Sequence, residues 1–165
     1  MPFRFALFGL VAAAMPSSAG AQETGPPIGG PEDAAVAGEL WDAIEKAGLV
    51  GPHAILAQPY EGTDPHGTIL ITLATEVSVN SRAADTLVKK NFAGDDISIE
   101  SVATDPNQFL GSITVMFRRD AGYDADNLDW FWAKYNLDGS LQSNPMGMLL
   151  AGRGSRPKAV ALPAT

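Results

Sequence analysis

The chain has 165 residues and a formal net charge of −8 at pH 7, and none of its residues is cysteine. The acidic balance disfavours nucleic acids and anionic membranes as partners, because both repel a negative surface. The lack of cysteine excludes disulfides, thiolate metal sites and thiol nucleophiles, so the stability of the fold has to come from packing.

The first 21 residues have the form of a secretory signal. Arg4 gives a basic start, an apolar core runs from Phe5 to Met15, and Ala19-Gly20-Ala21 supplies a cleavage site of the A-x-A type. A retained membrane anchor is the alternative, but the apolar run is shorter than the roughly 18 to 20 residues that cross a bilayer. We therefore expect cleavage after Ala21 and a periplasmic or secreted protein that is free of the membrane.

The rest of the chain divides by composition into a linker, one domain and a tail. Residues 22–31 are rich in Gly and Pro and predict a flexible linker. Residues 32–153 have the length and patterning of one domain, and residues 154–165 predict a disordered tail.

The domain opens with the pattern of an amphipathic helix. Val36, Leu40 and Ile44 recur at a spacing of four, while acidic residues occupy the opposite side. Gly48 marks the expected end of this helix, and Trp41 flanks the apolar stripe. We expect Trp41 to hold the helix against a sheet.

After an extended segment at 49–61, alternating and β-branched residues predict a series of strands. Asp138-Gly139 is a strong hairpin signal, so the strand that starts near Ser140 should run antiparallel to the one before it. Residues 76–85 are ambiguous and include a short helix candidate around 81–85. The strands are expected at residues 68–74, 86–92, 97–102, 112–119 and 129–137. The pattern predicts an α+β fold, with an antiparallel sheet of about five strands and the N-terminal helix packed on one face.

Several short motifs, taken in their order and spacing, resemble the cytochrome P-460 domain family. The resemblance extends from about Leu40 to Arg153, and the aromatic strand DWFWAKY is its most specific part. The motifs are Pro65-His66-Gly67, LVKKNF at 87–92, ITVMF at 113–117, Gly122-Tyr123-Asp124, DWFWAKY at 129–135, and Gly147-Met148 followed by LAGR at 150–153.

The resemblance also implies a missing haem site. In that family a Cys-x-x-Cys-His motif follows the stretch that resembles residues 147–153, attaches a c-type haem and supplies its axial histidine. Here the following residues are GSRPKAVALPAT, without cysteine or histidine. We therefore expect a domain that has lost covalent haem and needs no cofactor. Family members that oxidise hydroxylamine cross-link a lysine to the porphyrin, and the matching position is Lys89, a candidate catalytic residue; Lys90 stands where the family usually has glutamate.

Lys89 and two tryptophans are the main candidates for a site. Neighbouring residues of a strand point to opposite faces, so either Lys89 or Lys90 must point toward the interior or a cleft, where it could act as base or nucleophile. The alternative is a lysine that extends its amine to solvent at a sheet edge. Trp130 and Trp132 share a face, and with Lys89 and Tyr135 they form the candidate pocket for a planar ligand; two core faces are the alternative.

The remaining polar candidates are weaker. His66 is a weak candidate for ligating haem iron or a metal, and a role in its own turn is favoured; His53 is weaker still. Asp124, Asp126 and Asp129 have a D-x-D-x-x-D spacing but lack the other positions of a calcium loop, so a solvated acidic turn is expected.

Three functions follow from these observations. The first is an exported P-460-like domain without covalent haem that binds a small apolar or planar ligand or a periplasmic protein partner. The alternative is haem-dependent oxidation or binding of hydroxylamine or nitric oxide, as in the family, with haem held non-covalently through Lys89 or His66. The third is a structural or interaction domain with a filled core.

Overall fold

The computed structural model describes residues 28–63 and 66–154. The predicted signal, most of the predicted linker and the predicted tail from residue 155 onward lie outside these residues. No helix in the described part of the chain has the length and apolar character of a membrane span. The elements are α1 Pro31–Lys46, β1 Tyr60–Glu61, β2 Ile69–Val79, β3 Arg82–Phe92, α2 Ile99–Thr104, α3 Pro106–Phe109, β4 Leu110–Arg118, the 3-10 turn η1 Ala125–Asn127, β5 Trp130–Tyr135 and β6 Ala151–Arg153.

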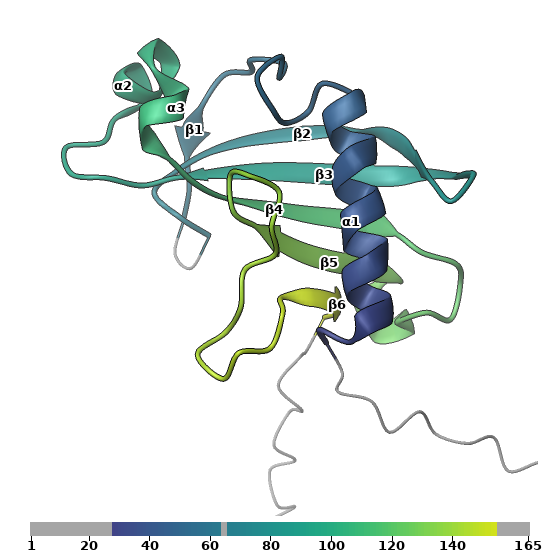
Figure 1. The fold of residues 1–165 in the computed structure, drawn as a ribbon. Coiled ribbons are helices and arrows are strands. Elements are labelled where there is room, and N and C mark those ends of the chain that lie inside the picture. The colour runs from purple at the N-terminus through teal and green to yellow at the C-terminus, as the bar shows by residue number, and fades with distance from the viewer. Residues whose placement is uncertain (1–27, 64–65, 155–165) are drawn as a thin grey trace, which may run out of the picture.

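The strands form one antiparallel sheet of six strands, in which each strand pairs with the next along the chain. Helix α1 crosses one face of this sheet, and α2 and α3 lie together near one end of it (Figure 1). The predicted α+β fold with an N-terminal helix on one face is confirmed. The two strands beyond the predicted set are β1, which has only two residues, and β6, which has three.

Helix α1 forms where the apolar spacing predicted it. Pro31 at the first turn and the acids Glu32 and Asp33 suit its N-terminal end. Leu40 and Ile44 are 0% exposed and pack on the sheet. The Trp41 ring lies 5.1 Å from the ring of Tyr135 on β5, so it does hold the helix to the sheet.

Alternate residues of the central strands point toward α1 and form the core. Burial follows a period of two along β3, β4 and β5, as expected for strands with one face covered. A smaller cluster packs under α2. The main core contains Val88, Val115, Phe117, Phe131, Ala133 and Tyr135 from these strands, and the smaller cluster contains Ile69, Ile71, Phe92 and Val102.

The prediction of a short helix around residues 81–85 is wrong. Strands β2 and β3 run on through this region and meet in a two-residue turn, with φ values of 51° at Asn80 and 63° at Ser81. Two positive φ values in a row characterise the turn type that matches the twist of paired strands. Val79 and Ala84 are buried on either side of the turn, so burial supports the longer hairpin.

The strand predicted at 97–102 is also wrong, because α2 occupies most of this segment. The Ser98 hydroxyl accepts a hydrogen bond from the Ser101 amide at 3.1 Å, and the Ser101 hydroxyl accepts one from the Ser98 amide at 2.9 Å. This reciprocal cap satisfies two amides at the helix start, which favours a helical turn over an extended chain.

The last part of the predicted domain completes one edge of the sheet. The turn at Asp138-Gly139 does return the chain antiparallel to β5, with an Asn136 amide to Ser140 carbonyl bond of 2.8 Å, but the pairing is brief. Strand β6 completes the edge and contains Gly152, which also bridges to Ile28 of the predicted linker.

Two tyrosine hydroxyls in this core predict opposite effects of the same substitution. The buried Tyr135 hydroxyl donates to the Ala37 carbonyl at 2.8 Å, so Tyr135→Phe should lower the free energy of unfolding by about 1 kcal/mol. The buried Tyr123 hydroxyl has no partner among the described residues, so Tyr123→Phe should raise it by about 1 kcal/mol. Urea denaturation measures both, and changes of the same sign would refute the assignment.

Candidate functional site

The face of the sheet that α1 does not cover, here called the open face, presents two lysines. Lys89 of β3 and Lys134 of β5 both pair with Thr114 of β4, so they lie in one row across three strands. Their Cα atoms are about 9–10 Å apart, because neighbouring strands are separated by about 4.8 Å. The two lysine side chains are long enough to reach one shared anion across this distance.

Each lysine affects the other through its charge. Partial burial lowers the pKa of Lys89, and the positive charge of Lys134 lowers it further. Neither lysine forms an ion pair within residues 28–63 and 66–154. The two amines therefore form a basic site without a counter-ion of its own.

An apolar row lies directly beside the basic row on the open face. This row lies two residues along the strands from the lysines and consists of Leu87 on β3, Met116 on β4 and Trp132 on β5, which pair with one another. The Trp132 side chain is 36% exposed, so its ring offers a surface on which a flat molecule can stack.

A second aromatic residue borders the basic row from the other edge of the sheet. Tyr60 of β1 is 43% exposed, and its hydroxyl lies 2.7 Å from the Thr72 hydroxyl. Thr72 pairs with Lys89, which places Tyr60 at the β1 end of the row. The site therefore has two cations in one row, with Tyr60 at the β1 end of the row and Trp132 beside Lys134 on β5.

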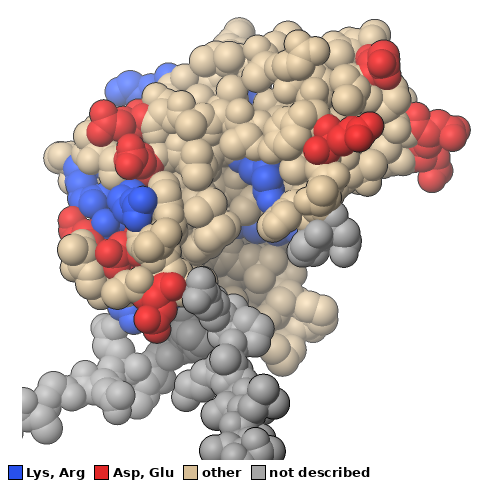
Figure 2. Space-filling model, turned by 180° about the vertical axis from the view of Figure 1, so that it is seen from behind, with Lys and Arg blue, Asp and Glu red and all other residues tan. Residues whose placement is uncertain are grey.

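Figure 2 shows the molecule from behind, with the open face toward the viewer. Basic side chains lie in a hollow near the middle of this face, and acidic side chains lie toward its edges, where one edge also carries further basic side chains. At one end of the face, the carboxylates of Glu76 and Asp85 line a shallow hollow with Trp130. An anion is expected to bind at the lysines in the middle of the face rather than beside these two carboxylates.

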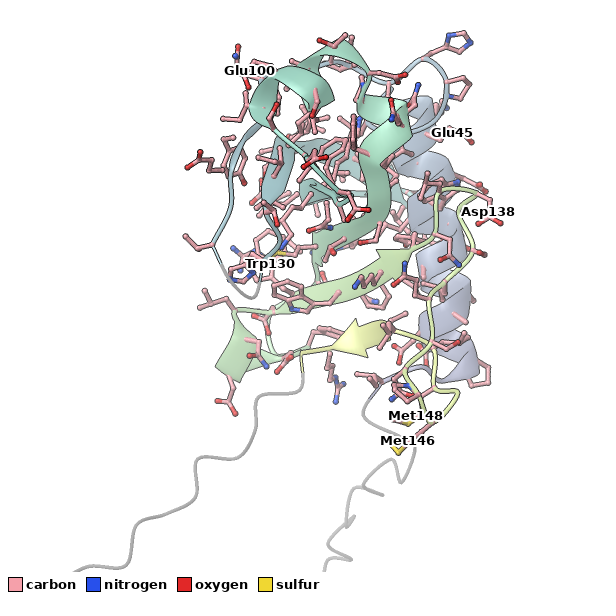
Figure 3. The ribbon with its side chains drawn as sticks, turned by 90° about the vertical axis from the view of Figure 1, so that its left-hand side faces the viewer. Glu45, Glu100, Trp130, Asp138, Met146 and Met148 are labelled. Atoms are coloured by element: carbon pink, nitrogen blue, oxygen red, sulfur yellow. The ribbon has the colours of Figure 1, made fainter. Side chains whose placement is uncertain are left out.

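The two tryptophans of the aromatic strand have different surroundings. Both lie on the side of the sheet away from α1, as Figure 3 shows for Trp130. The Arg118 guanidinium covers Trp130, with its carbon 4.2 Å from the ring centroid. Trp132 is thus the better stacking surface, and Trp130 is more remote from Lys89.

Tyr135 does not belong to the pocket in which it was grouped. It lies on the α1 face of β5, is 0% exposed and uses its hydroxyl on α1. Residues at odd spacing on one strand point to opposite faces, so Tyr135 cannot line a pocket with the two tryptophans. Burial raises the pKa of its hydroxyl, which is consistent with a core position.

The structure places the other candidates in loops. His66 is exposed in the loop before β2, and His53 is exposed in the turn after α1. Lys134 and Tyr60 belong to this candidate site but were not among the predicted pocket residues, although the sequence pattern already placed Lys134 on the face of the two tryptophans. Alternation with Trp130 and Trp132 was a usable signal for Lys134, whereas nothing local marked Tyr60.

The acidic motif holds its own loop together. The Asp129 carboxylate accepts hydrogen bonds from the Gly122 and Asp124 amides at 3.1 and 2.9 Å. The Asp124 carboxylate accepts from the Asn127 side chain and from the Gly154 amide. Within the described ranges, no group of three or more potential ligands is arranged to hold a metal ion.

Comparisons with known proteins give no family for this chain. None of the protein-family models, curated proteins or solved structures compared with it matches.

Proposed function

We propose that this chain binds a planar, anionic small molecule on the open face of its sheet. The observation that carries the proposal is the pair of lysines, Lys89 and Lys134, next to the exposed ring of Trp132. The aromatic ring would stack on the flat body of the ligand, and the two amines would pair with its acidic groups.

Binding is favoured over catalysis by the chemistry that this face offers. The sequence has no cysteine for thioether attachment, and the strands of the open face carry lysine and methionine side chains but no histidine. This set of donors does not fit the histidine-ligated c-type haem of the cytochrome P-460 domain family. We therefore derive no redox step, and retain from the resemblance only a flat ligand and an exported protein.

Protoporphyrin IX is a suitable probe, because it is flat, carries two carboxylates and contains no iron. We expect it to quench tryptophan fluorescence, and we expect Lys89→Met or Lys134→Met to weaken its binding about fivefold each, as for a half-exposed ion pair worth about 1 kcal/mol. Lys46→Met removes an exposed lysine from α1 and is the matched control. Equal affinities in all these variants would refute the site.

The pH dependence of binding gives a second test. Lys89 must be protonated to pair with an anion, so affinity should fall as the pH rises through its pKa. Removing the Lys134 charge should raise that pKa, so the fall in affinity should occur at higher pH in Lys134→Met than in the unmodified protein. Titrations between pH 7 and 11 measure the shift, and a shift to lower pH would contradict the coupling.

A further inference from the structure

A second lysine of β3 lies on the opposite side of the sheet from the proposed porphyrin site. Lys90 points toward the α1 side, and its side chain is 7% exposed. Its cross-strand neighbours are Ile71 and Ile113, both buried and apolar. Among the described residues, no carboxylate lies within 4.0 Å of the Lys90 amine. The amine also forms no hydrogen bond with any of these residues.

Lys90 lines a cavity of about 300 Å³, which is at the lower end of the size range of small-molecule pockets. The cavity lies beyond the C-terminal end of α1, between the loop at 50–56, the sheet, α3 and the turn after β5. Lys90 is its only charged lining residue, and Asn107 adds the only other polar side chain. The apolar lining residues are Val50, Pro52, Ala54, Leu56, Ile71, Phe92, Pro106, Leu110, Ile113 and Leu137.

The cavity has an apolar rim. Leu56 is 75% exposed and Leu137 is 48% exposed, and both also line the cavity. Exposed leucines cost free energy unless another apolar group covers them. The cavity therefore has one cation, Lys90, in its interior, and apolar side chains line it from Lys90 to the rim.

This arrangement specifies the chemistry of an occupant. Burial lowers the pKa of Lys90, because its side chain is largely shielded from solvent. The desolvation cost of the cation is thus already present in the free protein, and an entering carboxylate recovers part of it. An alkyl tail on the same molecule covers the leucines at the rim.

We infer that the Lys90 cavity binds a medium-chain aliphatic carboxylate, with the carboxylate at Lys90 and the tail toward Leu56 and Leu137. This site is separate from the open face, since Lys89 and Lys90 are neighbours that point to opposite sides of β3. The two proposals therefore fail or succeed independently.

Decanoate and decanol form a matched pair of probes that differ in charge. Isothermal titration should show that the unmodified protein prefers decanoate, and that Lys90→Met weakens decanoate about 10- to 100-fold while changing decanol little. Lys46→Met removes an exposed lysine of α1, is the matched control and should retain the preference. An unchanged preference in Lys90→Met, or no binding of decanoate by the unmodified protein, would overturn the inference.

Two further observations make the test independent of folding defects. Lys90→Met should have a melting temperature at or above that of the unmodified protein, because it removes an unpaired buried cation. Leu56→Glu changes an exposed side chain at the rim and should weaken decanoate several-fold more than decanol through repulsion. Equal losses for both probes in Leu56→Glu would count against a buried carboxylate that passes this rim.

Discussion

Replacing Leu40 by alanine is expected to lower the free energy of unfolding by about 2–5 kcal/mol, because it leaves a cavity between α1 and the sheet. Leu40 is 0% exposed and lies in the same cluster as Val88, Val115 and Phe131. Urea denaturation followed by circular dichroism measures the change.

The control for this prediction is the neighbouring residue of the same helix. Glu39 is exposed, so Glu39→Ala should change the free energy of unfolding by less than about 0.5 kcal/mol. If Leu40→Ala were as mild as Glu39→Ala, α1 would not be packed on the sheet through the face described here.

A comparable loss is expected from adding a single methyl group at Gly139. This residue has a φ of +87°, and a Cβ built on it would lie 2.4 Å from the Trp41 Nε1 atom. Trp41 is a rigid ring held against Tyr135, so it cannot move aside easily. Gly139→Ala should therefore cost about 1–2 kcal/mol for the left-handed backbone and about 1–3 kcal/mol for overpacking.

Gly147 separates these two costs. Its φ is +80°, yet a Cβ there would meet no atom within 4 Å. Gly147→Ala should carry only the backbone cost. The melting temperature of Gly139→Ala should therefore be clearly lower than that of Gly147→Ala. Figure 3 shows Asp138 of this turn beside α1. Equal melting temperatures for the two variants would mean that Trp41 does not pack over the turn at Asp138-Gly139.

The elements that the sequence predicted well are those with a clear period. The spacing of Leu40 and Ile44 identified α1, and alternation identified the main parts of β2, β3, β4 and β5. The misses have physical reasons. The capping pair at Ser98 and Ser101 outweighs the β-branched residues of α2, and the turn at Asn80-Ser81 lacks the glycine that marks most such turns.

The candidate site was predictable only in part. Alternation required that Lys89 and Lys90 point to opposite faces, and the structure has Lys89 on the open face and Lys90 in the cavity. The sequence could not decide which strand neighbours each lysine would have. The register of β3, β4 and β5 places Lys134 and Trp132 near Lys89 on the open face. The loop after α1 forms one wall of the cavity that Lys90 lines.

The most direct test of the proposed function is an NMR titration of the ¹⁵N-labelled protein with protoporphyrin IX. The indole signal of Trp132 and the amides of Lys89, Met116 and Lys134 should shift, while the indole signal of Trp41 and the amides of α1 should stay in place. Shifts that are confined to α1 and the loop at 50–56, with Trp132 unchanged, would contradict binding on the open face.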